Sequence, residues 1–139
     1  MKEWNEQAKS VSKITPDLEK ARALLKLIQL REKNIEIMAD DMITLVVESY
    51  YEIIKELITG IMSADGYKTV SHEMLIAYVA RFYPEFSSSK IMALDQLRKL
   101  RNEIAYRGVL IKPEYLERNK EVIMENISKL KTILLNKMK

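Results

Sequence analysis

Apolar residues recur three and four positions apart through most of this chain, which is the spacing of helices with one buried face. Between about residues 42 and 62 they cover most of the helical circumference, so this segment is predicted to be a central helix with neighbours on several sides. Narrower apolar stripes predict three more long helices, over about residues 16–38, 87–108 and 113–138. A shorter helix is predicted to end near Phe82, because Pro84 breaks the pattern.

The expected helix ends carry residues that suit them. Thr15-Pro16-Asp17 is typical of a helix start, with a capping hydroxyl, a proline in the first helical position and an early acid. Thr69 or Ser71 is expected to cap the short helix. Gly108 is expected to end a long helix in the left-handed conformation, and Pro113 is expected to open the last one.

These elements predict an all-α fold, an up-and-down bundle of four long helices plus one or two short helices. Trp4, Ala8 and Val11 predict a short helical extension over residues 1–14, and residues 63–68 are expected to form a loop. The chain has 139 residues and no internal repeat, so a single domain over residues 1–139 is expected.

Composition narrows the functional classes. The chain has no cysteine and one histidine, so neither disulfides nor the usual zinc sites are expected. No glycine-rich phosphate loop or other cofactor motif is present. The first residues are too polar for a secretory signal, and no apolar run approaches the roughly 20 residues that span a bilayer. We therefore expect a soluble cytoplasmic protein without metal, cofactor or membrane contact.

Charge is distributed unevenly along the chain. From Lys90 onward there are 12 Lys/Arg and 6 Asp/Glu, a net charge of +6, whereas residues 1–89 carry 11 and 14, a net charge of −3. A basic half joined to a mildly acidic half is compatible with nucleic-acid binding. It is equally compatible with the docking of two copies on each other, or with an ordinary solvated surface.

A polar face is predicted on the helix over residues 87–108. Arg98, Asn102 and Tyr106 are four residues apart and therefore lie one above another, with Arg101 beside them. Two arginines, an amide and a phenol on one face are suited to bind phosphate or an acidic partner.

The same residues also have a purely structural explanation. Arg98 and Arg101 can pair with Asp95, with Glu103 or with the acids of the central helix, and so hold the bundle or a dimer interface together. Those acids, which recur four apart, are Glu48, Glu52 and Glu56. They are interpreted as a solvated edge rather than a metal site, because no histidine or cysteine lies near them in sequence. His72 is interpreted as a surface residue near a helix cap, since nothing in the sequence places it near Arg101.

The motif Arg101-Asn102-Glu103-Ile104-Ala105-Tyr106 resembles the hallmark of the HEPN domain family (higher eukaryotes and prokaryotes nucleotide-binding). That hallmark is an arginine, usually followed by a polar residue, with a histidine further along near the helix end. Ser49-Tyr50-Tyr51 resembles the family's tyrosine pair, and Gly66-Tyr67-Lys68 with Ser71-His72-Glu73 resembles its bridge into the third helix. The resemblance covers about residues 15–138 and departs at the motif histidine, which is Tyr106 here.

The resemblance implies a dimer that acts on RNA without a metal ion. Arg101 would hold phosphate and Asn102 would orient its neighbours, while the proton transfers of the missing histidine would fall to Tyr106 or to no residue. A free phenol has a pKa near 10, so little phenolate forms at neutral pH. Since positioned acid–base catalysis contributes roughly 10²–10⁴-fold, weak or absent cleavage is expected. The remaining site residues expected by resemblance are Arg98 as a second cation and Ser49, Tyr50, Tyr51 and His72 as accessory groups.

Three functions remain open at this point. The first is a HEPN-like dimer that binds RNA or a nucleotide with weak or no ribonuclease activity, as the HEPN half of a toxin–antitoxin pair whose antitoxin is a nucleotidyltransferase. The second is a metal-independent endoribonuclease toxin with an altered catalytic set. The third is a non-catalytic helical scaffold.

Overall fold

A computed structural model describes all residues, 1–139, and shows a mainly helical chain. Four long helices and one short helix are joined by short connections, and two three-residue strands form a small antiparallel sheet. In chain order the elements are β1 (Val11–Lys13), α1 (Leu18–Glu36), α2 (Ile43–Asp65), β2 (Tyr67–Thr69), α3 (His72–Phe82), α4 (Ser88–Arg107) and α5 (Pro113–Lys137).

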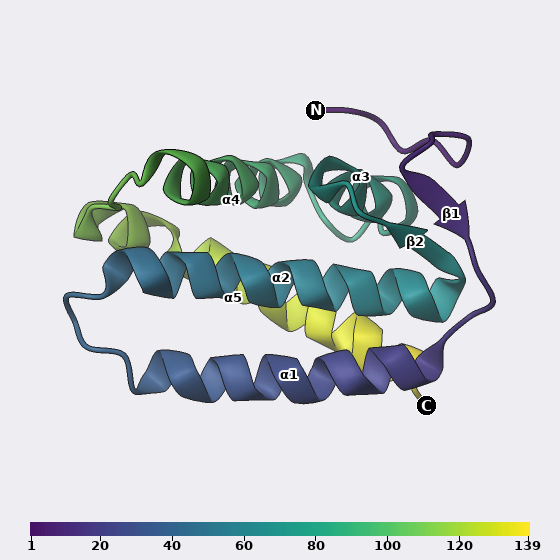
Figure 1. Cartoon of the computed structure of the whole chain (residues 1–139), viewed down its shortest axis with the longest axis horizontal. Coiled ribbons are helices and arrows are strands. Elements are labelled where there is room, and N and C mark those ends of the chain that lie inside the picture. Colours follow the sequence, from purple (N-terminus) through teal and green to yellow (C-terminus); the bar gives the residue numbers. More distant parts are fainter.

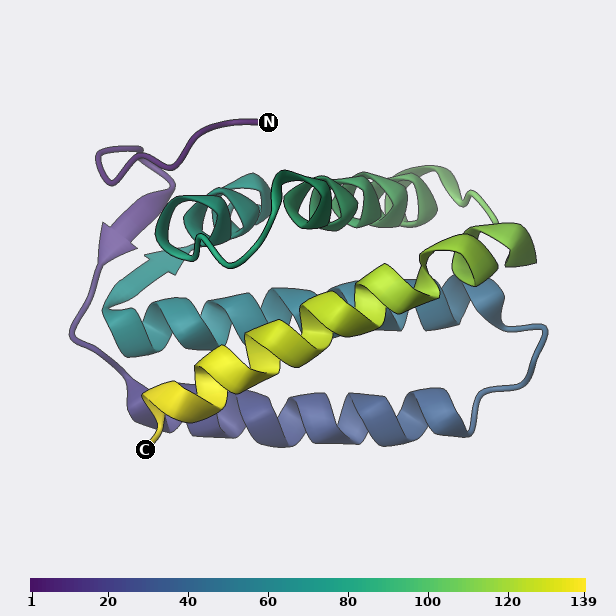
Figure 2. The ribbon, with the colours of Figure 1, turned by 180° about the vertical axis from the view of Figure 1, so that it is seen from behind.

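Helix α2 lies at the centre of the bundle, as its apolar circumference predicted. It contacts α1, α3, α4 and α5, and most of its residues from Val47 to Ser63 are buried. Figure 1 shows α1 and α2 running in opposite directions, with α3 and α4 following one another along the other side of α2. Helix α5 crosses behind α1 and α2 in that view, as Figure 2 shows from the opposite side. The prediction of a mainly helical fold is therefore confirmed.

The prediction of a helix within residues 1–14 is wrong. These residues form a turn and then strand β1, in which Val11 pairs with Thr69 and Lys13 pairs with Tyr67. The indole of Trp4 packs edge-on against the rings of Tyr67 and Tyr78. Spacing alone could not distinguish an amphipathic turn of helix from an extended segment whose aromatic residue packs on another element.

Two helix ends differ from the sequence prediction. Asp17, not Thr15, caps α1, because its carboxylate accepts a hydrogen bond from the backbone N–H of Lys20 at 3.0 Å. Helix α2 continues to Asp65 and ends at Gly66, whose φ of 94° is the left-handed conformation that glycine favours. The predicted loop over residues 63–68 is therefore mostly helix and strand. Ser71 and Gly108 cap their helices as predicted.

The acids of α2 are not a simple solvated edge. Glu56 is 5% exposed and accepts two hydrogen bonds from Arg31 of α1, at 2.8 and 2.9 Å. Glu52 pairs with Lys55 and, across to α4, with Arg101. Only Glu48 of the three forms no ion pair. Because Arg31 and Arg101 reach α2 from opposite sides, this acidic line joins α1, α2 and α4.

Candidate functional site

Charged and polar side chains from α2, α3 and α4 gather on one side of α2. We call them the Arg101 cluster: Tyr51, Glu52, Lys55, His72, Asp95, Arg98, Lys99 and Arg101. Tyr51 and Lys55 are four residues apart on α2 and so share a face, while His72 opens α3 directly after its cap. The cluster exists because α3 and α4 both pack on this face of α2.

Arg101 is the least completely paired cation of the cluster. Its only ion pair joins one terminal nitrogen to Glu52 at 3.6 Å, which is longer than a hydrogen bond. Its Nε is buried and has no hydrogen-bond partner. The side chain remains 23% exposed, so part of the guanidinium meets solvent. An arginine with donors to spare at the surface is suited to receive an anionic oxygen.

Arg98 is held differently. It is buried, and its Nε donates a hydrogen bond to Asp95 at 2.9 Å. Burial raises the pKa of Asp95, but the hydrogen bond and charge of Arg98 outweigh it, so this pKa lies below its ordinary value. This pair, and the longer pair of Arg101 with Glu52, are both among those that the structural explanation predicted. The Arg98–Asp95 pair therefore lies within α4, and Arg101 is the more exposed and less completely paired of the two arginines.

His72 lies in the cluster, against the sequence interpretation that nothing places it near Arg101. Its Nδ1 is 3.0 Å from the hydroxyl of Tyr51. Burial lowers the pKa of His72, and the positive charges of Arg101 and Lys55 lower it further. Burial also raises the pKa of Tyr51 above its ordinary value. At pH 7 the imidazole of His72 is therefore neutral and the phenol of Tyr51 is protonated, and the His72 tautomer decides which of the two donates their hydrogen bond.

The other predicted residues lie apart from these contacts. Tyr106 is 79% exposed in the last turn of α4, and neither its hydroxyl nor the half-buried amide of Asn102 forms a hydrogen bond. Tyr50 is buried on another face of α2, where it lines a cavity with residues of α1 and α5. Ser49 is half-buried and makes no side-chain hydrogen bond. The predicted face of Arg98, Asn102 and Tyr106 is thus not one continuous polar surface.

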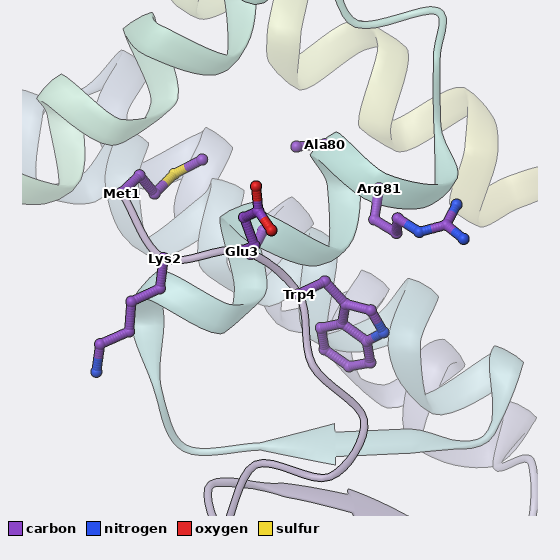
Figure 3. Close-up of a pocket in the computed structure, with 7 residues that line it drawn as sticks. Met1, Lys2, Glu3, Trp4, Ala80 and Arg81 are labelled. Atoms are coloured by element: carbon purple, nitrogen blue, oxygen red, sulfur yellow. The ribbon is translucent and has the colours of Figure 1, made fainter.

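The Arg101 cluster is largely covered by the helices that form it: Tyr51, Asp95 and Arg98 are buried, Lys55 and Arg101 are partly exposed, and only Lys99 is well exposed. The cavities beneath the N-terminal segment, between α1, α2 and α5, at the α1–α2 loop and along α5 are not lined by Arg101, Arg98 or His72. One cavity of about 370 Å³ lies beneath the N-terminal segment, between Trp4 and the end of α3 (Figure 3), and contains no predicted site residue. No three His, Asp or Glu side chains come together as a metal site.

The chemistry of the cluster follows from its charges. Four cations, Lys55, Arg98, Lys99 and Arg101, face two carboxylates, Glu52 and Asp95, so positive charge is in excess. The neutral imidazole of His72 adds no charge but can accept or donate a proton. Lys55 was not among the predicted site residues, although its position four residues after Tyr51 places both side chains on the same face of α2. No sequence signal indicates the position of His72, since it depends on how α3 packs on α2.

Comparison of this chain with protein-family models, with curated proteins and with solved structures gave no match. No helix combines the length and apolar character needed to cross a membrane.

Proposed function

We propose that this chain is a HEPN-like helical protein that binds RNA through the Arg101 cluster and cleaves it weakly or not at all. The observation that carries the proposal is that the partly exposed Arg101 makes a single long contact, 3.6 Å to Glu52, and lies beside three further cations. The resemblance of residues 101–106 to the HEPN hallmark supports the choice of RNA as the polyanion.

The shape of the surface favours a polymer over a small nucleotide. Sites for small molecules are usually concave and enclose most of the ligand. The cations of the Arg101 cluster that reach solvent, Lys55, Lys99 and Arg101, are distributed over α2 and α4 and line none of the cavities described above. A phosphate backbone suits this arrangement, because each phosphate needs only one exposed cation and successive phosphates extend along the surface.

The experiment is a titration of fluorescent single-stranded RNA, followed by anisotropy at low salt. Arg101→Ala is expected to weaken binding about tenfold, since a charge-assisted hydrogen bond at a partly exposed site contributes about 1.5 kcal/mol. The matched control is Arg22→Ala, which removes an exposed, unpaired arginine from α1, on the far side of α2. Equal affinity of the native chain and Arg101→Ala would leave the scaffold as the remaining function.

A second candidate is a metal-independent ribonuclease in which His72 replaces the missing motif histidine. The favouring observation is that a neutral imidazole, fixed by Tyr51 at 3.0 Å, lies within the electrostatic reach of Arg101. In the tautomer whose Nδ1–H donates to the Tyr51 hydroxyl, the Nε2 lone pair is free to take a proton from an RNA hydroxyl at neutral pH, provided that the phosphate is held by the arginine.

A cleavage assay in the presence of a metal chelator separates the two candidates. The first predicts little or no cleavage by the native chain, with some activity gained by Tyr106→His. The second predicts native cleavage that His72→Gln abolishes and Tyr106→Phe leaves unchanged. Robust native cleavage that Tyr106→Phe abolishes would contradict both.

The resemblance also supplies the proposed partners. The chain is proposed to form a homodimer and to be the HEPN half of a toxin–antitoxin pair with a nucleotidyltransferase-type antitoxin. Co-expression of the chain with such a protein encoded next to it, followed by co-purification, tests the second partner directly.

A further inference from the structure

Helices α1, α2 and α5 border a cavity of about 170 Å³ that shares no residue with the Arg101 cluster. Its walls are apolar side chains from all three helices: Ile35, Ile53, Met124 and Ile127. An apolar cavity of about 150 Å³ holds a molecule the size of benzene. This cavity is therefore large enough for a linear organic molecule of about seven heavy atoms, but not for a nucleotide.

One buried hydroxyl in this cavity has no partner within the chain. Tyr50 lines the cavity and is 7% exposed, yet its hydroxyl forms no hydrogen bond, in contrast to the hydroxyls of Tyr51, Tyr67, Tyr78 and Tyr83. Burial alone raises the pKa of Tyr50, so at pH 7 this phenol is a neutral donor in apolar surroundings. Because a buried hydroxyl without a hydrogen bond is costly, a ligand that brings an acceptor to it is favoured.

A carboxylate at the edge of the same cavity is also unpaired. Glu32 and Glu36 lie four residues apart on α1 and both line the cavity, whereas no lysine or arginine does. Lys131 donates hydrogen bonds to both oxygens of Glu32, at 2.9 and 2.7 Å, and so neutralises that carboxylate. Glu36 is exposed and forms no ion pair. The cavity therefore combines an anionic edge, apolar walls and one buried hydroxyl.

We propose that this cavity binds a small linear amine with a second polar group at its other end, such as a five-carbon amino alcohol. The ammonium group pairs with Glu36, the methylene groups lie between the apolar side chains, and the ligand hydroxyl accepts a hydrogen bond from Tyr50. An anionic ligand would be repelled by Glu36, and a purely apolar one would leave the Tyr50 hydroxyl unpaired. This inference does not rest on RNA binding, because no residue of the Arg101 cluster takes part in it.

The first experiment is a titration of the native chain with aminopentanol, whose two polar groups lie at opposite ends, followed by the methyl NMR signals of isoleucine and methionine. A dissociation constant of about 1 mM is expected, since five buried methylene groups contribute about a thousandfold. The signals of Ile53, Met124 and Ile127 should shift. Met92, which is 61% exposed on α4, is the internal control and its signal should not move. No binding at about 10 mM, or shifts confined to other methyl groups, would overturn the proposal.

Two variants, titrated with aminopentanol, pentylamine and pentanol, test the two ends of the site. Tyr50→Phe removes only the hydroxyl, so it is expected to weaken aminopentanol about fivefold and to leave pentylamine unchanged. Glu36→Gln is expected to weaken both amines about threefold and to leave pentanol unchanged. The matched controls are Tyr115→Phe, which removes a half-buried hydroxyl from α5, and Glu19→Gln, which removes an exposed acid from the first turn of α1. Equal affinity of the native chain and Tyr50→Phe for aminopentanol, or native binding of pentanol as tight as that of the amines, would contradict the proposal.

Discussion

The ion pair between Arg31 and Glu56 allows a quantitative prediction about how α1 is held to α2. Removing one partner of a fully buried pair costs about 3–5 kcal/mol, because the other charge is left buried and unpaired. Here Glu56 is 5% exposed but the side chain of Arg31 is 34% exposed, so water can partly replace the guanidinium. We therefore expect Arg31→Met to lower the free energy of unfolding by about 2 kcal/mol.

Urea unfolding followed by circular dichroism measures this change. In a chain of this size a loss of 2 kcal/mol corresponds to a decrease in Tm of about 6 °C. The double variant Arg31→Met/Glu56→Met should recover most of the loss, since an apolar pair of similar volume has no buried charge to compensate. A decrease below about 0.5 kcal/mol for Arg31→Met would refute the reasoning, because it would mean that the carboxylate of Glu56 is adequately solvated without its partner.

Three further predictions concern other parts of the fold. The pKa of His72 is lower in the folded chain than in the unfolded chain, so the unfolded chain binds a proton at this imidazole first as the pH falls below about 6.5. The contribution of His72 to the free energy of unfolding should therefore be constant above that pH and decrease below it. His72→Gln should remove this dependence of the free energy of unfolding on pH between pH 7.5 and 5.5, and an unchanged dependence in the variant would contradict the prediction. Gly66→Ala should lower the free energy of unfolding in urea by about 2 kcal/mol, because φ is 94° and the added Cβ would lie 3.0 Å from the backbone oxygen of Ile14. The control is Gly108→Ala, which should cost less because no atom lies near the added Cβ. Asp65 accepts hydrogen bonds from Tyr78 and Tyr83, so Asp65→Asn should also lower stability by about 2 kcal/mol, whereas Asp40→Asn should not.

The helices could be predicted from the sequence because each has its own apolar stripe and its own end signals. The apolar circumference of α2 identified the central helix, and Gly108 and Pro113 marked the boundary between α4 and α5 correctly. The sheet could not be predicted, since β1 and β2 are only three residues long, too short for an alternating pattern to be recognised in the sequence.

The candidate site was predictable only where it lies on one helix. Arg98 and Arg101 are three residues apart and so were expected to be neighbours on the helix, with Asp95 among their possible partners, but the spacing did not show that Arg98 would be buried while Arg101 stays partly exposed. That distinction comes from packing against α2. His72 enters the site from α3, and such a contact between distant segments leaves no periodic signal in a single sequence.

The salt dependence of RNA binding tests the central claim most directly. Each cation that neutralises a phosphate contributes about one unit to the slope of log K against log salt concentration. We predict that Arg101→Ala lowers this slope by about one unit and that Arg22→Ala leaves it unchanged. Equal slopes for the native chain and Arg101→Ala would contradict the account, because Arg101 would then hold no phosphate.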